Sequence, residues 1–265
     1  MNEPEAVTRR EVVYEACDLT LRFGGVTALA GVSVELRSDE LLGVIGPNGA
    51  GKTSLLNSMS GFYRPQEGAL RLMGQPITGY APHRLARAGI GRTFQSAHVF
   101  SGLSVVENIM VARNCRMKAN IAQAFLYYPW AHREEVAHRE VVEEILEFLE
   151  IESIRHEPVG TLGYGLRKRV DLGRALALEP KILLMDEPMA GMNLEEKEDL
   201  ARFILDLREA RRLPVVLVEH DMSVVMDLAD RIVVLDFGRK IADGTPAEVR
   251  RSPEVIAAYL GGAET

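Results

Sequence analysis

The stretch Gly46-Pro47-Asn48-Gly49-Ala50-Gly51-Lys52-Thr53 decides the fold class, because it fits the phosphate-loop pattern G-x-x-x-x-G-K-[ST]. The glycines let backbone N–H groups turn inward around phosphate oxygens, and the helix that follows offers its positive N-terminal end to the same anion. Lys52 is placed to reach the β- and γ-phosphates, and Thr53 to give its hydroxyl to Mg²⁺. Because the apolar run Leu41–Ile45 precedes the loop as a buried strand would, the pattern predicts a nucleotide site rather than a coincidence.

A second apolar run, Ile182–Met185, ends in two carboxylates, Asp186 and Glu187. Open parallel sheets bind ligands at the carboxyl ends of their strands, so we expect these acids beside the phosphate loop. Asp186 is suited to hold Mg²⁺ through a water molecule, and Glu187 to accept a proton from attacking water. Acidic residues after a strand can simply mark the end of that strand, and only the pairing of this strand with the phosphate loop favours the functional interpretation.

His220 follows another strand-like run, Val215–Val218, which should bring it to the same edge within reach of a γ-phosphate. A lone histidine is more often structural, so this role is open on the residues alone. The chain contains no N-K-x-D element of the kind that guanine-specific proteins carry, which favours ATP over GTP.

The order of the apolar runs predicts three parts. Strand-length runs alternate with helical patterns around the phosphate loop, which indicates a mostly parallel sheet. The N-terminal stretches Val12–Arg22 and Val26–Leu36 are β-rich and flank a Gly-Gly pair, as in an antiparallel sheet. Between Val105 and about Arg155 the pattern is mainly helical, with apolar side chains on one face and glutamates on the other.

One group of aromatic residues within that helical part admits two interpretations. It surrounds Pro129, and its members are Phe125, Tyr127, Tyr128 and Trp130. Local core is favoured, and a partner surface is the alternative.

Composition excludes several classes of protein. The 265 residues carry 31 Lys and Arg against 38 Asp and Glu, a net charge of −7, and we find no basic stripe, which argues against a nucleic-acid partner. Two distant cysteines, Cys17 and Cys115, make neither a disulfide framework nor a metal cluster. The N-terminus lacks the apolar core of a signal peptide, and the apolar runs have strand length. We therefore expect a cytoplasmic protein that meets a membrane only through partners.

Taken together, these residues resemble the nucleotide-binding subunit of ABC transporters over nearly the whole chain. The phosphate loop looks like the family's Walker A motif and Ile182–Glu187 like Walker B. Thr93-Phe94-Gln95 resembles the Q-loop, with Gln95 meeting Mg²⁺. Leu162–Leu166 stands at the LSGGQ signature, ahead of a helix expected at Arg167–Leu178.

Three further family positions are carried over on the same basis. Met189–Asn193 occupies the D-loop, and His220 the switch histidine. Phe23 stands where the family places an aromatic ring against adenine, although a strand-end core residue is the alternative.

The resemblance implies a RecA-like P-loop NTPase core of the α/β class, with an antiparallel β subdomain and an inserted α-helical subdomain. We expect the core in residues 1–96 and 158–265 and the insert in 97–157. Two such subunits sandwich ATP, one supplying the Walker motifs and the other the signature. The expected site comprises catalytic residues, ATP-binding residues, metal-binding residues and residues that face the ATP of the partner. The expected catalytic residues are Lys52, Glu187 and His220, and the expected metal-binding residues are Thr53, Gln95 and Asp186. The expected ATP-binding residues are Phe23, Gly46, Asn48, Gly49, Ala50, Gly51, Lys52, Thr53, Ser54 and Gln95. The residues expected to face the ATP of the partner are Gly163, Tyr164 and Gly165, with Asn193 in the D-loop.

Within the superfamily the match narrows to branched-chain amino acid importers. The segments that carry it are Gly89–Gln95, Glu187–Asn193, Val218–Met222 and the ending Asp-Gly-Thr-Pro-Ala-Glu-Val. The long helical insert suits the larger of that system's two ATPase subunits. This implies ATP and Mg²⁺ as cofactors, a second ATPase subunit, two transmembrane permeases, indirect contact with an extracytoplasmic solute-binding protein, and a place on the cytoplasmic face of the inner membrane.

Three positions depart from the family pattern. The signature serine is replaced by Gly163, its glutamine by Leu166, and the D-loop aspartate by Asn193. Loss of the serine hydroxyl predicts a slower site wherever this chain's signature completes it.

Other functions stay open at this point. Relatives import urea, amides or aromatic acids, and an export or lipid-extraction ATPase would carry nearly the same motifs. A soluble ABC protein acting on ribosomes or DNA would need a second cassette or a coiled coil. A non-hydrolysing binding module would not need Glu187 and His220.

Overall fold

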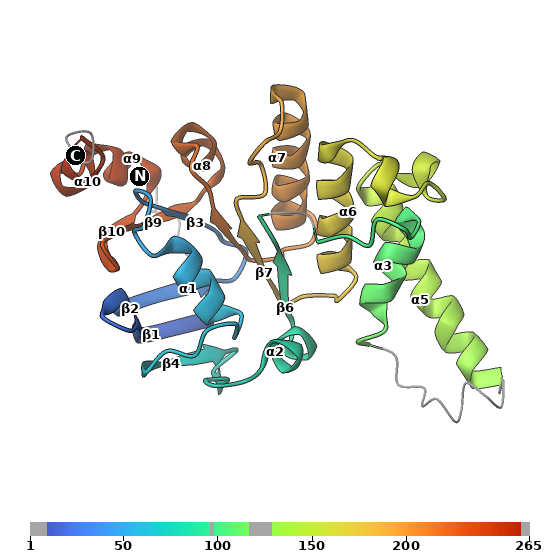
Figure 1. The fold of residues 1–265 in the computed structure, drawn as a ribbon, viewed down its shortest axis with the longest axis horizontal. Helices are drawn as coiled ribbons and strands as arrows, with labels where there is room; N and C mark the ends of the chain where they lie inside the picture. The colour runs from blue at the N-terminus through green and yellow to red at the C-terminus, as the bar shows by residue number, and fades with distance from the viewer. Residues whose placement is uncertain (1–9, 96–97, 117–128, 261–265) are drawn as a thin grey trace, which may run out of the picture.

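The computed structural model describes residues 10–95, 98–116 and 129–260. Its centre is a six-stranded sheet in the order β10-β9-β3-β8-β7-β6, in which β10 runs antiparallel to β9 and all other neighbours are parallel (Figure 1). The strands are β3 (Leu41–Ile45), β6 (Ile90–Thr93), β7 (Ile182–Asp186), β8 (Val215–Val218), β9 (Arg231–Asp236) and β10 (Arg239–Gly244). Every residue of β3, β7 and β8 is buried, as expected for parallel strands covered on both faces.

A second, antiparallel sheet in the order β2-β1-β4-β5 packs beside the first. Its strands are β1 (Val12–Phe23), β2 (Val26–Arg37), β4 (Glu67–Leu72) and β5 (Gln75–Pro76). This confirms the predicted N-terminal hairpin, which turns at Gly24 with a φ of 56°. The two sheets are joined through one apolar cluster that includes the inner residues of α1 (Lys52–Met59).

Successive side chains of β3 point to opposite faces of the sheet, and this explains how α1 is held. Leu42 and Val44 point into the cluster with α1 and the second sheet, whereas Leu41 and Ile45 belong to the cluster on the other side. Helices α7 (Leu194–Glu209) and α8 (Met222–Leu228) cover that other side. The phosphate loop between β3 and α1 is therefore anchored at both ends in core.

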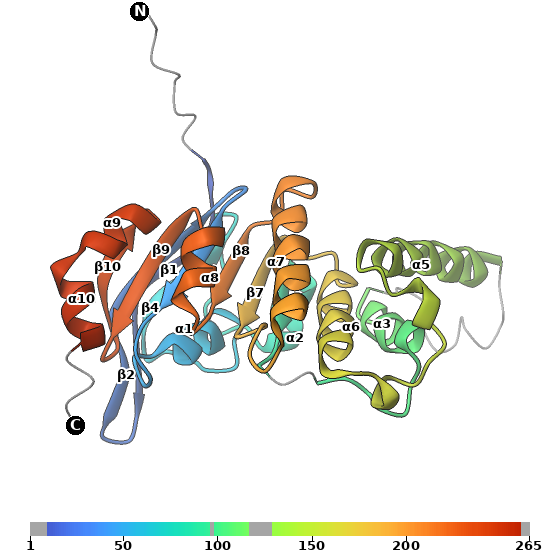
Figure 2. The same ribbon diagram turned by 90° about the horizontal axis from the view of Figure 1, so that it is seen from above.

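The remaining helices lie at the two ends of the sheet (Figures 1 and 2). Helices α3 (Val105–Arg113), α5 (Pro129–Phe148) and α6 (Tyr164–Leu176) form a lobe beyond β6, with the short turns η1 (Glu152–Ile154) and η2 (Val159–Thr161). Helices α9 (Pro246–Arg251) and α10 (Pro253–Leu260) lie at the opposite end, and α2 (Pro82–Ala88) precedes β6.

The helical prediction for the middle of the chain is confirmed where the structure describes it. On α5 and just after it, the apolar positions Val142, Ile145 and Leu149 are buried, and the glutamates opposite them are exposed. Of the aromatic group around Pro129, Phe125, Tyr127 and Tyr128 lie outside the described residues, as does the side chain of Trp130. The boundaries of the insert, 97–157, stay a prediction.

The predicted start of the signature helix was wrong. The helix was expected at Arg167–Leu178 but runs over Tyr164–Leu176, so the signature glycines lie at its N-terminus and not ahead of it. Glycine has low helix propensity, which made Gly163-Tyr164-Gly165 look like loop. Gly163 instead takes the N-cap position, which tolerates glycine well.

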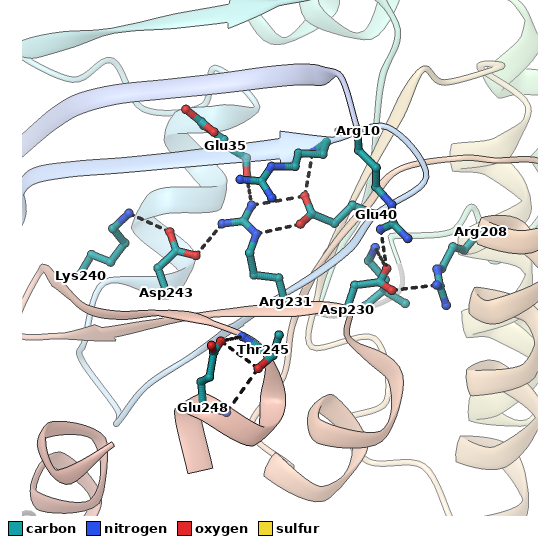
Figure 3. Close-up of polar contacts among 12 residues, drawn as sticks. Arg10, Glu35, Glu40, Arg208, Asp230, Arg231, Lys240, Asp243, Thr245 and Glu248 are labelled. Atoms are coloured by element: carbon teal, nitrogen blue, oxygen red, sulfur yellow. Dashed lines mark hydrogen bonds and ion pairs between the residues drawn. The ribbon is translucent and has the colours of Figure 1, made fainter. Parts of the chain in front are cut away.

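A charged network ties the two sheets together at the β9–β10 end (Figure 3). Arg231 of β9 donates to both Glu40 and Asp243, with a 2.8 Å bond from its Nε to Glu40 Oε1, and to the backbone oxygen of Glu35 on β2. Glu40 is buried, and its carboxylate is paired with Arg231.

No helix within the described ranges is both long enough and apolar enough to cross a lipid bilayer.

Candidate functional site

The phosphate loop adopts a backbone shape that only glycine permits at two of its positions. Gly46 has φ 153°, and a Cβ there would lie 2.1 Å from the backbone oxygen of Leu235. Gly51, the N-cap of α1, has φ 103°, and a Cβ there would lie 2.6 Å from the backbone oxygen of Ala28. The loop is thus pressed against its neighbours at both ends, and α1 begins directly after it.

Lys52 is held by its own loop. Its ammonium donates to the backbone oxygens of Gly46 at 2.7 Å and Pro47 at 3.0 Å, and the residue is buried. Burial lowers the pKa of Lys52, and the negative charges of Glu187 and Asp186 oppose that effect. Thr53, the next residue, is exposed.

Asp186 and Glu187 are buried together where β7 ends. Asp186 pairs with Arg92, whose Nη2 lies 3.1 Å from Asp186 Oδ2, and the Arg92 guanidinium is also within cation–π range of the Phe62 and Phe94 rings. Burial raises the pKa of Asp186, and the Arg92 charge opposes the rise.

Glu187 brings together two other predicted residues. One of its oxygens accepts a hydrogen bond from Gln95 Nε2 at 2.7 Å, and the other contacts His220 Nε2. Its backbone N–H donates to the oxygen of Val218 at 2.8 Å, which fixes the end of β7 to the end of β8. Its φ of 46° lies in the left-handed region that non-glycine residues seldom adopt, a feature that clusters at functional sites.

Three residues in contact with this group received no role from the sequence. Arg92 pairs with Asp186, and buried Glu219 accepts N–H bonds from Met189 at 2.8 Å and His220 at 3.3 Å. Burial raises the pKa of Glu219. Lys168 is bound to the backbone of Phe94 and Gln95. For Arg92 and Glu219 the signal was available, since Arg92 lies within the motif Gly89–Gln95 and Glu219 follows the apolar run Val215–Val218.

The signature and D-loop positions meet each other through Glu196. Gly165 N–H donates to Glu196 Oε1 at 3.2 Å, and Glu196 exchanges capping bonds with Asn193 at the start of α7. Tyr164 is 40% exposed and Gly163 has nothing within 4 Å of a Cβ position, so both are free to face another molecule.

Phe23 lies at the end of β1 and is 46% exposed, which removes the interpretation as a core residue. Its ring meets Tyr63 edge to face with centroids 5.0 Å apart. The pair is available to a planar base.

The fold and this site define a P-loop ATPase. The family model described as ABC transporter matches residues 29–190, and a second one, described as branched-chain amino acid ATP-binding cassette transporter, matches residues 239–265. The chain belongs to the ABC transporter family, as an ATP-binding subunit with ATPase activity.

Relatives and solved structures agree with that assignment. The chain is 40% identical to the high-affinity branched-chain amino acid transport ATP-binding protein BraF of Pseudomonas aeruginosa, over 95% of this chain and 98% of the relative. It is 37% identical to the corresponding protein LivG of Escherichia coli, over 92% and 96%. The crystal structure of the ADP conformation of MJ1267, an ATP-binding cassette of an ABC transporter, covers 94% of this chain with a TM-score of 0.82 and 31% identity, and 99% of that chain is matched.

Proposed function

We propose that this chain hydrolyses ATP to power the uptake of branched-chain or related hydrophobic amino acids by an ABC importer. The observation that carries the solute class is the similarity to BraF and LivG over nearly the full length of both chains. The match of residues 239–265 to the branched-chain family model supports the same class from a separate part of the chain.

The residues present fit a magnesium–ATP complex. Asp186, Thr53 and the Gln95 amide supply the hard oxygen atoms that Mg²⁺ prefers. Within the described part of the chain no group of three or more His, Cys, Asp or Glu could hold a metal alone, and Mg²⁺ in such enzymes relies on one or two carboxylates and the substrate phosphates. When bound, the ion would neutralise charge on the β- and γ-phosphates.

ATP binding would replace hydrogen bonds that residues of the phosphate loop now make to one another. The Lys52 ammonium, which donates to the oxygens of Gly46 and Pro47, would transfer to phosphate oxygens. Backbone N–H groups of Gly46 and of residues 48–53, with Ser54, would surround the phosphates, and Phe23 would stack on adenine. Asn48, Gly49 and Ala50 form the turn that makes this cradle.

Glu187 is the proposed general base. Gln95 and His220 each occupy one oxygen of its carboxylate, so these contacts must break before the attacking water can bind there. Glu187 would take the proton from that water, and His220 would then be free to bond the γ-phosphate. Gln95 would turn its amide oxygen to the metal.

The site on this chain is only half of a working site. We propose that Gly163, Tyr164 and Gly165, with the D-loop residue Asn193, face ATP held by a second ATPase subunit. Two permease subunits would receive the motion at the cytoplasmic face of the membrane, with a solute-binding protein on the other side.

Solute uptake by a strain that lacks this chain tests the proposal. We expect uptake of labelled leucine to be lost and to return when the chain is restored, with labelled urea and an aromatic acid as comparison solutes. Loss of urea or aromatic acid uptake alone would reassign the solute, and unchanged uptake of all three would overturn the importer function.

A further inference from the structure

A carboxylate from a neighbouring helix lies at the start of helix α6. The backbone N–H of Gly165, in the first turn of α6, donates to Oε1 of Glu196, in the first turn of α7, at 3.2 Å. A Cβ on Gly165 would lie 2.4 Å from the same oxygen, so a glycine here allows the carboxylate to come this close. Glu196 therefore binds one of the N–H groups that we propose to face ATP held by the partner.

The N-cap of α6 explains why the helix takes an acceptor from outside. The first N–H groups of a helix have no partner within the helix, and a polar side chain at the N-cap commonly accepts from the second or third of them. The N-cap residue is Gly163, which has no side chain, and Gly165 is the second residue of the helix. The carboxylate of Glu196 takes the place of the acceptor that Gly163 does not provide.

The second oxygen of Glu196 is held by its own helix. Oε2 accepts the backbone N–H of Asn193 at 3.0 Å, and Oδ1 of Asn193 accepts the N–H of Glu196 at 2.9 Å, which makes a capping box at the start of α7. Among the described residues, the carboxylate is therefore bound by backbone N–H groups and not by a cation. Backbone N–H groups at the N-terminus of a helix are also the arrangement that binds phosphate.

The start of α6 is accessible from outside the molecule. Tyr164 is 40% exposed, nothing lies within 4 Å of a Cβ position on Gly163, and Glu196 is half-buried. A phosphate that approached the N–H of Gly165 would meet a carboxylate already bound there. Like charges repel, so the two anions compete for this place.

We infer that the Glu196 carboxylate occupies the place of the γ-phosphate at this chain's signature and has to be displaced when the partner's ATP binds there. The inference rests on the proposed function, in which Gly163, Tyr164 and Gly165 face ATP held by a second subunit. Glu196 then opposes ATP at that site and does not oppose ADP, because ADP has no γ-phosphate.

The test uses the transporter complex in which this chain alone carries Lys52→Ala, isolated by two affinity tags when both ATPase chains are copies. Loss of Lys52 weakens nucleotide binding at this chain's own loop, so the remaining site combines the partner's loop with this chain's signature. Adding Glu196→Gln keeps the length of the side chain and an acceptor oxygen but removes the charge. Competition of ATP with a fluorescent ATP analogue should show that the affinity for ATP rises about threefold or more, the size of effect that a charge at a helix N-terminus has.

Two comparisons make the result specific. Glu195→Gln removes the same charge from the preceding residue, which is exposed in the same turn of α7, and should leave the affinity for ATP unchanged. The affinity for ADP, measured by the same competition, should be the same with and without Glu196→Gln. If Glu196→Gln does not yield a folded complex, Glu196→Ala, which frees the N–H of Gly165 altogether, is measured with the same expected gain.

In a complex whose unmutated form hydrolyses ATP, an affinity for ATP that stays the same or falls would overturn this inference alone, since Glu196 would then be only a helix cap. An equal gain with Glu195→Gln, or an equal gain for ADP, would also overturn it, because the effect would then not depend on the γ-phosphate at the signature. An unmutated complex without ATPase activity would refute the proposed function and this inference with it.

Discussion

At the scale of single residues, the site is defined by which charges are paired. Arg92 is the clearest case, because it lies 94 positions before its partner and yet shares a hydrogen bond with the carboxylate proposed for the metal. It sets the conditions under which Asp186 is ionised.

Replacing Arg92 by Met should move the acid limb of kcat/KM for magnesium–ATP to higher pH. Burial raises the pKa of Asp186 and Arg92 opposes the rise, so removing the cation raises that pKa further. The metal needs the ionised form, which is lost as pH falls through the pKa. Opposite charges commonly move a carboxyl pKa by about 1–3 units, and we expect a shift of about one unit. Arg84→Met, which removes an arginine stacked on Tyr80, is the control; an acid limb that stays in place in Arg92→Met would contradict this assignment.

Gly163→Ser should strengthen ATP binding at the site that this chain's signature completes. Gly163 has φ −60° and open space around a Cβ, so serine fits the N-cap without strain. A hydroxyl bond to an anion contributes about 1.5–3 kcal/mol, which corresponds to a tenfold or greater gain in ATP affinity at that site. ATP titration of hydrolysis in the complex measures it, with Gly163→Ala as the matched variant. Equal effects of Ser and Ala would show that the hydroxyl meets no phosphate.

At the scale of elements, the sequence located the strands well because buried parallel strands are continuous apolar runs. β3, β7 and β8 were all predicted to within one residue. It missed β10, whose residues Arg239–Gly244 alternate polar and apolar weakly, because an edge strand is defined by its neighbour and not by its own composition. The capping box of α9, formed by Thr245 and Glu248, is a sequence pattern that marks the start of a helix.

The charged network at Arg231 should contribute strongly to the stability of the joined sheets. Arg231→Met leaves the buried carboxylate of Glu40 without its cation, and loss of one partner of a buried pair costs about 3–5 kcal/mol. Lys240→Met breaks only a partly exposed pair with Asp243 and should cost about 1 kcal/mol or less. Urea midpoints of the two variants measure the difference at unchanged m-value. Equal midpoints would mean that the apolar cluster alone joins the sheets.

At the scale of the whole molecule, the sequence established the family, the nucleotide loop and which residues gather at the carboxyl ends of the strands. It did not establish how they contact one another. Gln95 and His220 both contact Glu187, and Lys168 binds the backbone of Gln95. These contacts form only because side chains from separate elements meet in space. Such pairings leave no local pattern, since each partner is an ordinary polar residue in its own segment. The division at residues 97 and 157 and the roles of individual site residues stay predictions.

We have proposed that the phosphate loop is half of a hydrolytic site whose chemistry drives transport. Glu187 is its centre, because it is buried, holds two other site residues and stands beside Asp186 at the sheet edge. A general base contributes about 10²–10⁴ to a rate, so its removal should separate ATP binding from ATP use.

The most direct test is Glu187→Gln in every copy of this chain, measured in membrane vesicles that contain the transporter. We predict that hydrolysis at the site built on this chain falls at least about a hundredfold, that ATP affinity stays within a few-fold, and that uptake of labelled leucine stops in the same vesicles. Leucine uptake that continues at the unmutated rate would contradict the claim that ATP hydrolysis at this loop powers transport.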